Sequence, residues 1–306
     1  MKRAFTLLEL IIVIVILGII AMMSFNAIMN IYSNYFQTRT VNELETQTEI
    51  ALEQISKRLE HRIKPSVIAR KPSGGFLPLN DSRVNLNSGY EILEFIPYAY
   101  EIFNDVPSGN KAGRYSGYAD LAKSSPATGL ISPGSNFTTE VIETIKDLTC
   151  KDDASGCVDF ENKDGGVVAI FSDVYYDVQN SFGYKDNLNL DIAKVGVKST
   201  DGDTLEISGF ANKQISEQYH LAYTANAIAP EQSADPKDTA NGVFDLNLYY
   251  DYRPWMGQGY KDGEKATLAK NVTRFVFIEK NGVIVLKLCM RAKNSEITIC
   301  KSKAVY

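Results

Sequence analysis

The sequence predicts an α+β protein in which one long N-terminal α-helix packs on an antiparallel β-sheet head. Three observations support this: an apolar run over residues 5–23, a helical stripe of apolar residues before the first proline, Pro65, and two strand patterns around Asn281-Gly282. The composition, 44% hydrophobic and 23% charged in 306 residues, excludes a disordered or collagen-like chain. The formal net charge of −5 argues against a uniform nucleic-acid binder, so nucleic acid is not indicated as a partner.

The apolar run is long enough to cross a membrane. Its 19 residues span about 28 Å as a helix, close to the bilayer core of about 30 Å. We place the transmembrane part at residues 5–25. Lys2 and Arg3 precede it, which predicts a cytoplasmic N-terminus and an exported remainder. A cleaved secretory signal is the alternative, but no good small-x-small cleavage site follows the run at the usual distance.

Glu9 is the unusual residue of this segment, because no other charge occurs until Arg39. A carboxylate among Leu and Ile costs a few kcal/mol in a bilayer unless it is paired or protonated. A free N-terminal ammonium on a neighbouring chain would supply the counter-charge. Cleavage just before Phe5 would create such an ammonium.

The run from Ala4 to Val13, Ala-Phe-Thr-Leu-Leu-Glu-Leu-Ile-Ile-Val, resembles the processing signature of type IV pilins and type II secretion pseudopilins. The resemblance implies that a prepilin peptidase cuts between Ala4 and Phe5 and methylates the new Phe5 amine. It also implies that Glu9 neutralises the terminal amine of an adjacent subunit during assembly. The chain departs from the family pattern at Ala4, where Gly is usual, and has Asn26 where many major pilins have a helix-kinking Pro.

The helix is expected to continue as an amphipathic segment, so we assign residues 1–4 to a leader, 5–64 to the helix and 65–306 to a β-rich head. The apolar positions of its second half follow spacings of three and four, and they end in Leu52, Ile55, Leu59 and Ile63. Pro65 disfavours α conformation at Lys64, where the helix should stop. A coiled-coil stalk is the alternative interpretation of this stripe.

The head contains several short runs of alternating β-branched and aromatic residues, which predict strands. They lie at 91–98, 167–171, 205–207, 218–225 and 243–250, and a hairpin pairs 195–198 with 205–207. Residues 104–136 and 229–242 are rich in polar and turn-forming residues and are expected to be irregular.

The C-terminal segment gives the clearest register. Asn281-Gly282 between 272–280 and 283–291 predicts a type I′ hairpin in which Phe277 faces Leu286. A second turn then places Met290 opposite Ile299 on the same side. The apolar face of this three-stranded meander needs a cover, and the stripe of the N-terminal helix is the natural one.

The four cysteines are predicted to form two disulfides. The hairpin register places Cys289 directly opposite Cys300, within bridging distance. Cys150 and Cys157 enclose a short loop that contains Asp152 and Asp153. An oxidising exterior favours disulfides, and the spacing fits no common zinc pattern.

The sequence gives little sign of catalysis. It contains no Walker loop, zinc-protease helix or Gly-x-Ser-x-Gly elbow, so we expect no enzyme and no cofactor. His61 is interpreted as a solvated helix residue, and the turn at Asp201-Gly202-Asp203 is preferred over a short calcium loop, as is a disulfide loop over a calcium site near Asp152. Trp255, the only tryptophan, is expected in the core, although an exposed partner anchor is the alternative.

The resemblance therefore implies a subunit that is itself a substrate of the peptidase. Its expected partners are the prepilin peptidase, other pilin or pseudopilin subunits and an inner-membrane assembly platform. A head of this size favours a minor pilin in a priming or near-tip position of a type IV filament, and it loosely resembles J-type minor pseudopilins. The alternatives are a minor pseudopilin of type II secretion and, from another class, a membrane-anchored periplasmic binding protein or enzyme that never polymerises.

Overall fold

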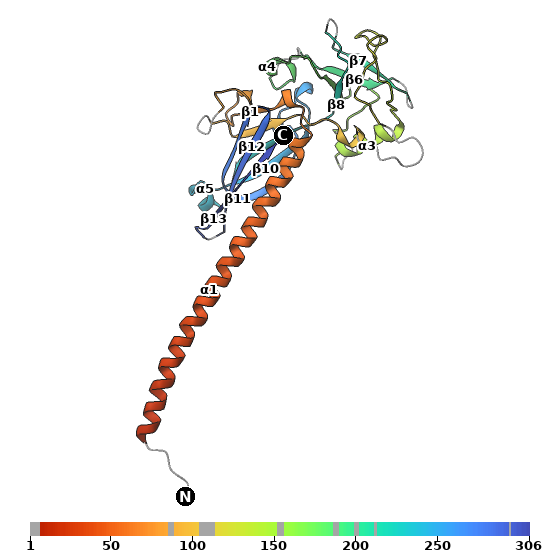
Figure 1. Ribbon diagram of the computed structural model, residues 1–306. Coiled ribbons are helices and arrows are strands. Elements are labelled where there is room, and N and C mark those ends of the chain that lie inside the picture. The colour runs from red at the N-terminus through yellow and green to blue at the C-terminus, as the bar shows by residue number, and fades with distance from the viewer. Residues whose placement is uncertain are drawn as a thin grey trace.

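The computed structural model describes residues 7–84, 89–103, 114–151, 156–185, 190–198, 202–210, 213–293 and 295–306. Within these residues the chain forms one long helix that carries a head built on two antiparallel sheets (Figure 1). The N-terminal half of the helix extends away from the head, while its other end and the C-terminus of the chain lie together at the head. The α+β prediction is confirmed.

The helix α1 runs over Leu7–Glu60. It ends four residues before the predicted boundary at 64, because the backbone after it already forms hydrogen bonds with the head. The backbone at Ile63 is extended, and its N–H donates to the carbonyl of Ile96 at 2.8 Å. Pro65 then starts the short 3₁₀ turn η1, Lys64–Ser66, where its missing N–H costs nothing.

The larger sheet has eight strands in the order β13-β12-β11-β10-β9-β3-β1-β2, and all its neighbours pair antiparallel. We call it the main sheet. Its strands are β1 Ile68–Arg70, β2 Phe76–Pro78, β3 Ile92–Phe95, β9 Ala225–Gln232, β10 Phe244–Tyr252, β11 Glu264–Lys280, β12 Val283–Arg291 and β13 Thr298–Val305. The short helix α5, Pro236–Ala240, connects β9 and β10.

The predicted C-terminal register is confirmed. Phe277 pairs with Leu286 and Met290 with Ile299. Asn281 and Gly282 both have positive φ, 54° and 79°, as a type I′ turn requires. The structure adds one irregularity, a register shift between Val272 and Arg274, and β11 begins earlier than predicted.

Residues 96–224, which we call the inserted lobe, interrupt the main sheet between two hydrogen-bonded neighbours, β3 and β9. The lobe has its own five-stranded sheet in the order β4-β7-β6-β5-β8. Its strands are β4 Leu130–Ile131, β5 Val168–Phe171, β6 Ala193–Val197, β7 Thr204–Ser208 and β8 Tyr219–Ala222, and its helices are α2 Tyr100–Phe103, α3 Thr139–Thr149 and α4 Val178–Ser181. The predicted hairpin pairs as β6 and β7.

Two expectations for irregular segments need correction. The stretch 229–242 begins inside β9, which continues to Gln232, because its partner β10 is still beside it. The stretch 104–136 includes β4 and turns; its first part, 104–113, lies outside the described residues.

Three apolar cores arrange the elements in layers. The first lies between α1 and one face of the main sheet. The second lies between the opposite face of the main sheet and the inserted lobe, and it contains Trp255. The third lies within the lobe, between its sheet and α3. The helix that covers the meander is α1, as the sequence predicts.

Candidate functional site

The N-terminal half of α1 is an apolar surface that the head leaves uncovered. Every side chain from Leu7 to Arg39 is exposed, and the helix is long and apolar enough to cross a membrane by its length and composition. A soluble protein rarely exposes a continuous apolar surface of this size. This half of α1 must therefore be covered by lipid, by other helices or by both in turn.

Glu9 lies in the first turn of α1, on this apolar half. It is the only carboxylate among residues 7–42, and negative charge near a helix N-terminus is favourable. Ala4 and Phe5, the predicted cleavage and methylation residues, lie outside the described residues. The processing prediction thus stays a prediction, as does the assembly role of Glu9.

The second half of α1 is fixed to the main sheet by the predicted stripe. Ile55 and Leu59 are fully buried, and Leu52 is nearly so. They pack with Leu246, Leu286 and Leu288 of the main sheet, among others. Rigid docking of this half means that any force on the apolar half is transmitted directly to the head.

A row of ion pairs joins the same half of α1 to the edge strand β13. Lys301 Nζ lies 2.7 Å from Glu49 Oε2 and 3.7 Å from Glu45 Oε1, and Lys303 pairs with Glu53. Four helix residues rise about 6 Å and two strand residues about 7 Å, so the two rows match. The hydrogen bond and charge of Lys301 lower the pKa of Glu49, and Lys303 does the same for Glu53.

Arg62 fastens the end of α1 to the end of the meander. Its guanidinium donates to the carbonyls of Leu59 at 2.8 Å, Gly282 at 3.2 Å and Tyr306 at 3.1 Å. Burial lowers the pKa of Arg62, although the carboxylate of Glu279 opposes the shift. Sequence reasoning missed this contact, because two of the three carbonyls, those of Gly282 and Tyr306, are more than 200 positions away and leave no local pattern.

His61 corrects the prediction of a solvated helix residue. It lies just beyond α1, and its ring stacks on Tyr100 with centroids 4.1 Å apart. Its Nδ1 is 3.1 Å from the hydroxyl of Tyr98. The histidine therefore packs α1 against the start of the inserted lobe.

Both predicted cysteine pairs are disulfides in the structure. Cys289 and Cys300 are directly paired across β12 and β13, which ties the edge strand that carries the lysine row. Cys150 and Cys157 close the loop that follows α3.

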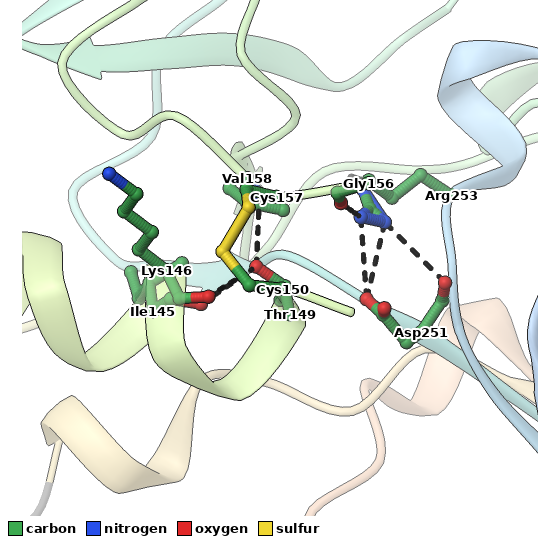
Figure 2. The surroundings of a disulfide bond; sticks show 9 residues. All are labelled: Ile145, Lys146, Thr149, Cys150, Gly156, Cys157, Val158, Asp251 and Arg253. Atoms are coloured by element: carbon green, nitrogen blue, oxygen red, sulfur yellow. Dashed lines mark hydrogen bonds and ion pairs between the residues drawn. A yellow bond between two sulfur atoms is a disulfide. The ribbon is translucent and has the colours of Figure 1, made fainter. Parts of the chain in front are cut away.

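The Cys150–Cys157 disulfide lies beside Gly156, whose backbone contacts Arg253 (Figure 2). The carbonyl of Gly156, next to Cys157, accepts from Arg253 Nη2 at 2.7 Å, and Arg253 also pairs with Asp251 Oδ1 at 3.2 Å. Burial raises the pKa of Asp251 to about 6, although the charge of Arg253 works in the other direction. The loop of the inserted lobe is thereby attached to the end of β10.

The other candidate sites are placed as follows. Trp255 is fully buried, and its indole N–H donates to the carbonyl of Gly166 at 2.9 Å, so the core interpretation is confirmed. Asp152, Asp153 and Asp201 lie outside the described residues. Among the residues that the structure describes, no three His, Cys, Asp or Glu side chains gather as metal ligands.

The comparisons with known proteins agree with the N-terminal geometry. The model of the family described as "Prokaryotic N-terminal methylation motif" matches residues 1–25. This match covers the run around Glu9 and the start of the exposed apolar half. No curated protein and no solved structure matches the chain.

Proposed function

We propose that this chain is a minor subunit of a type IV filament in a priming or near-tip position. Its N-terminal methylation motif supports a type IV pilin- or pseudopilin-like protein. The observation that carries the proposal is the uncovered apolar half of α1 with its single carboxylate, Glu9. In such a filament the apolar halves of neighbouring subunits cover one another. The head needs no catalytic role, and we propose that it has none.

Assembly follows from two steps at the N-terminus. The prepilin peptidase removes residues 1–4 and methylates the amine of Phe5, and the formal net charge falls from −5 to −7 because Lys2 and Arg3 are lost. The new ammonium of one subunit then pairs with Glu9 of its neighbour, which offsets the cost of a carboxylate in the membrane. This contact sets the register between subunits.

The same segment anchors the subunit before assembly. The apolar half of α1 crosses the inner membrane with its N-terminus in the cytoplasm, and the head lies in the periplasm until an inner-membrane assembly platform takes the subunit into the filament. Oxidising conditions there fit the two disulfides.

Mass spectrometry of the N-terminal peptide tests the processing step. We expect a mature chain that begins with N-methylated Phe5. Retention of Met1-Lys2-Arg3-Ala4 in cells with an active peptidase would instead support a membrane-anchored protein that never polymerises.

The assembly step is tested by Glu9→Gln, which removes the charge and keeps the shape. Glu43→Gln is the matched control, because Glu43 is an exposed carboxylate on the same helix but beyond the apolar half. We expect Glu9→Gln to be processed but left out of filaments, and Glu43→Gln to assemble. Normal incorporation of both variants beside trimmed neighbours contradicts the proposal. Deletion of the chain separates the two systems: loss of surface pili supports the proposal, and loss of protein secretion with intact pili supports the pseudopilin alternative.

A further inference from the structure

A small cavity lies where the main sheet meets the inserted lobe. Its volume is about 280 Å³, near the lower end of small-ligand sites, which run from about 300 to 1,000 Å³. Three segments line it: the β1–β2 turn, the chain just after α4, and the stretch from η2, Pro254–Met256, to η3, Tyr260–Asp262. None of these segments belongs to α1 or to the assembly contact.

Among the residues that the structure describes, the lining contains three cations, Arg70, Lys71 and Lys261, and no carboxylate. Arg70 is held rigidly, because its Nε donates to the fully buried Glu94 at 2.6 Å and its Nη2 donates to the carbonyl of Tyr184 at 3.4 Å. The other oxygen of Glu94 accepts from the hydroxyl of Tyr252 at 2.9 Å. Glu94 thus fixes the guanidinium and balances its charge, and no residue in the described part of the chain accepts from Nη1, so its donors are available to a ligand.

The two lysines are not balanced in the same way. Within the described part of the chain, neither Lys71 nor Lys261 has a carboxylate at ion-pair distance. Lys71 Nζ lies 4.6 Å from the ring centroid of Tyr90, and Lys261 Nζ lies 5.8 Å from that of Tyr260. The charge of Lys261 contributes to lowering the pKa of Glu231, but that carboxylate is already bound by Tyr249, Asn247 and Lys265. The cavity mouth therefore carries two positive charges that favour an anion.

The remaining lining suits a sugar ring. Tyr260 is half-buried and packs edge-on against Tyr249 with centroids 5.1 Å apart, which fixes its ring at the wall. Gln258 accepts from the backbone of Arg253 through Oε1 at 2.8 Å, and no described residue accepts from its amide NH₂, which can therefore donate to a ligand. Gly74 and Gly257 have positive φ and open space where a Cβ would stand, which lets a ligand approach the backbone closely.

We infer that this cavity binds a small anionic sugar, that is, a single sugar unit bearing a carboxylate or a phosphate. The acidic group lies between Lys71, Lys261 and the exposed edge of Arg70, and the ring lies against Tyr260 and the Gln258 amide. Because the lining comes from both the main sheet and the inserted lobe, the bound sugar also holds the two together.

Isothermal titration calorimetry of the full chain in detergent micelles tests the inference with three probes: glucuronate, glucose 6-phosphate and neutral glucose. We expect saturable binding of at least one anionic probe with a Kd of about 1 mM or tighter, and no saturation with glucose. Tighter binding of glucuronate indicates a site for a carboxylate, and tighter binding of glucose 6-phosphate indicates a site for a phosphate. Raising the salt concentration should weaken the binding, since the two lysines are accessible to solvent ions.

The double variant Lys71→Ala/Lys261→Ala should raise the Kd of the anionic probe by about tenfold or more. Lys287→Ala is the control, because Lys287 is an exposed lysine on β12 outside the cavity. Failure of both anionic probes to saturate the wild-type chain overturns the inference, and so does equal binding by the double variant or by glucose. These outcomes are independent of filament assembly, which the Glu9 experiment measures separately.

Discussion

Replacing Ile55 by Ala tests whether burial of the α1 stripe holds the helix on the head. Ile55 is fully buried in the core between α1 and the main sheet. Truncating a buried Ile to Ala removes apolar contacts and leaves a cavity, which costs about 2–5 kcal/mol of unfolding free energy. The matched control is Ile50→Ala on the same helix, where the side chain is 52% exposed and the expected change is within about 0.5 kcal/mol.

Trp255 supplies the assay, because it is the only tryptophan and is fully buried between the main sheet and the inserted lobe. Its fluorescence can follow urea unfolding of the full chain in detergent. With an m-value of about 3 kcal/mol/M, the Ile55→Ala midpoint should fall by about 1 M, while Ile50→Ala leaves it unchanged. Equal midpoints for the two variants would refute the claim that this stripe carries the docking energy.

The remaining predictions concern the edge that receives α1. Cys289→Ala/Cys300→Ala removes a link across 11 residues and should cost about 3 kcal/mol of stability by the chain-entropy relation, measured as a lower urea midpoint. Non-reducing peptide mapping of the wild type should show Cys289 joined to Cys300 and Cys150 joined to Cys157. Crossed links would contradict the predicted register. The lowered pKa values of Glu49 and Glu53 give stability that is present above their ordinary value of 4.5 and is lost as the pH falls through the lowered values. Hydrogen exchange of the β13 amides should therefore accelerate, relative to its intrinsic rate, as the pH falls below about 5 and through the lowered pKa values. Lys301→Met/Lys303→Met should flatten that dependence, and an unchanged profile in this variant would count against the ion-pair row.

The parts of the fold that could be predicted from the sequence are those fixed by local chemistry. Asn281 and Gly282 can each adopt a positive φ, as a type I′ turn requires. The pair therefore determines both the turn and the register of β11 and β12. The register then determines the Cys289–Cys300 pair. The shift between Val272 and Arg274 was not predictable in this way, because the sequence there has no Asn-Gly turn signal, although Asn271 beside it has φ 56°.

The strand β9 runs into a stretch that its polar and turn-forming composition predicted to be irregular. Pro230 lacks a donor N–H and normally argues against a central strand. However, β3 pairs only with Asn226, Ala227 and Ile228 of β9. Beyond Ile228 the described residues give β9 one strand neighbour, β10, where Pro230 lies opposite Leu246. The missing N–H of Pro230 can therefore lie on the side that has no strand partner. Where a neighbouring strand stops is a tertiary fact that the sequence of β9 does not contain.

The candidate cavity was missed for a related reason. Arg70 and Glu94 are 24 positions apart, and Tyr252 completes the contact from much later in the chain. A buried ion pair of this kind is costly to break from one side only. The sequence around Arg70 and Glu94 does not indicate a binding site, because each is a single charged residue in a short strand. Their role depends on burial between the main sheet and the inserted lobe, which only the folded structure shows.

The position of the inserted lobe explains how assembly and head function can be separate. The chain leaves the main sheet after Phe95 and returns at Ala225, and these two points are neighbours across the β3–β9 pairing. Because entry and exit are adjacent, the lobe can change in size without moving α1, the meander or their ion-pair row. The surfaces that the lobe shares with the main sheet, including the cationic cavity, are then the places where the two parts constrain each other. If the inferred ligand binds, a change of its specificity should therefore arise from the lobe side and the η2–η3 stretch, whereas the proposed function places the assembly constraint on Glu9 and the buried stripe of α1.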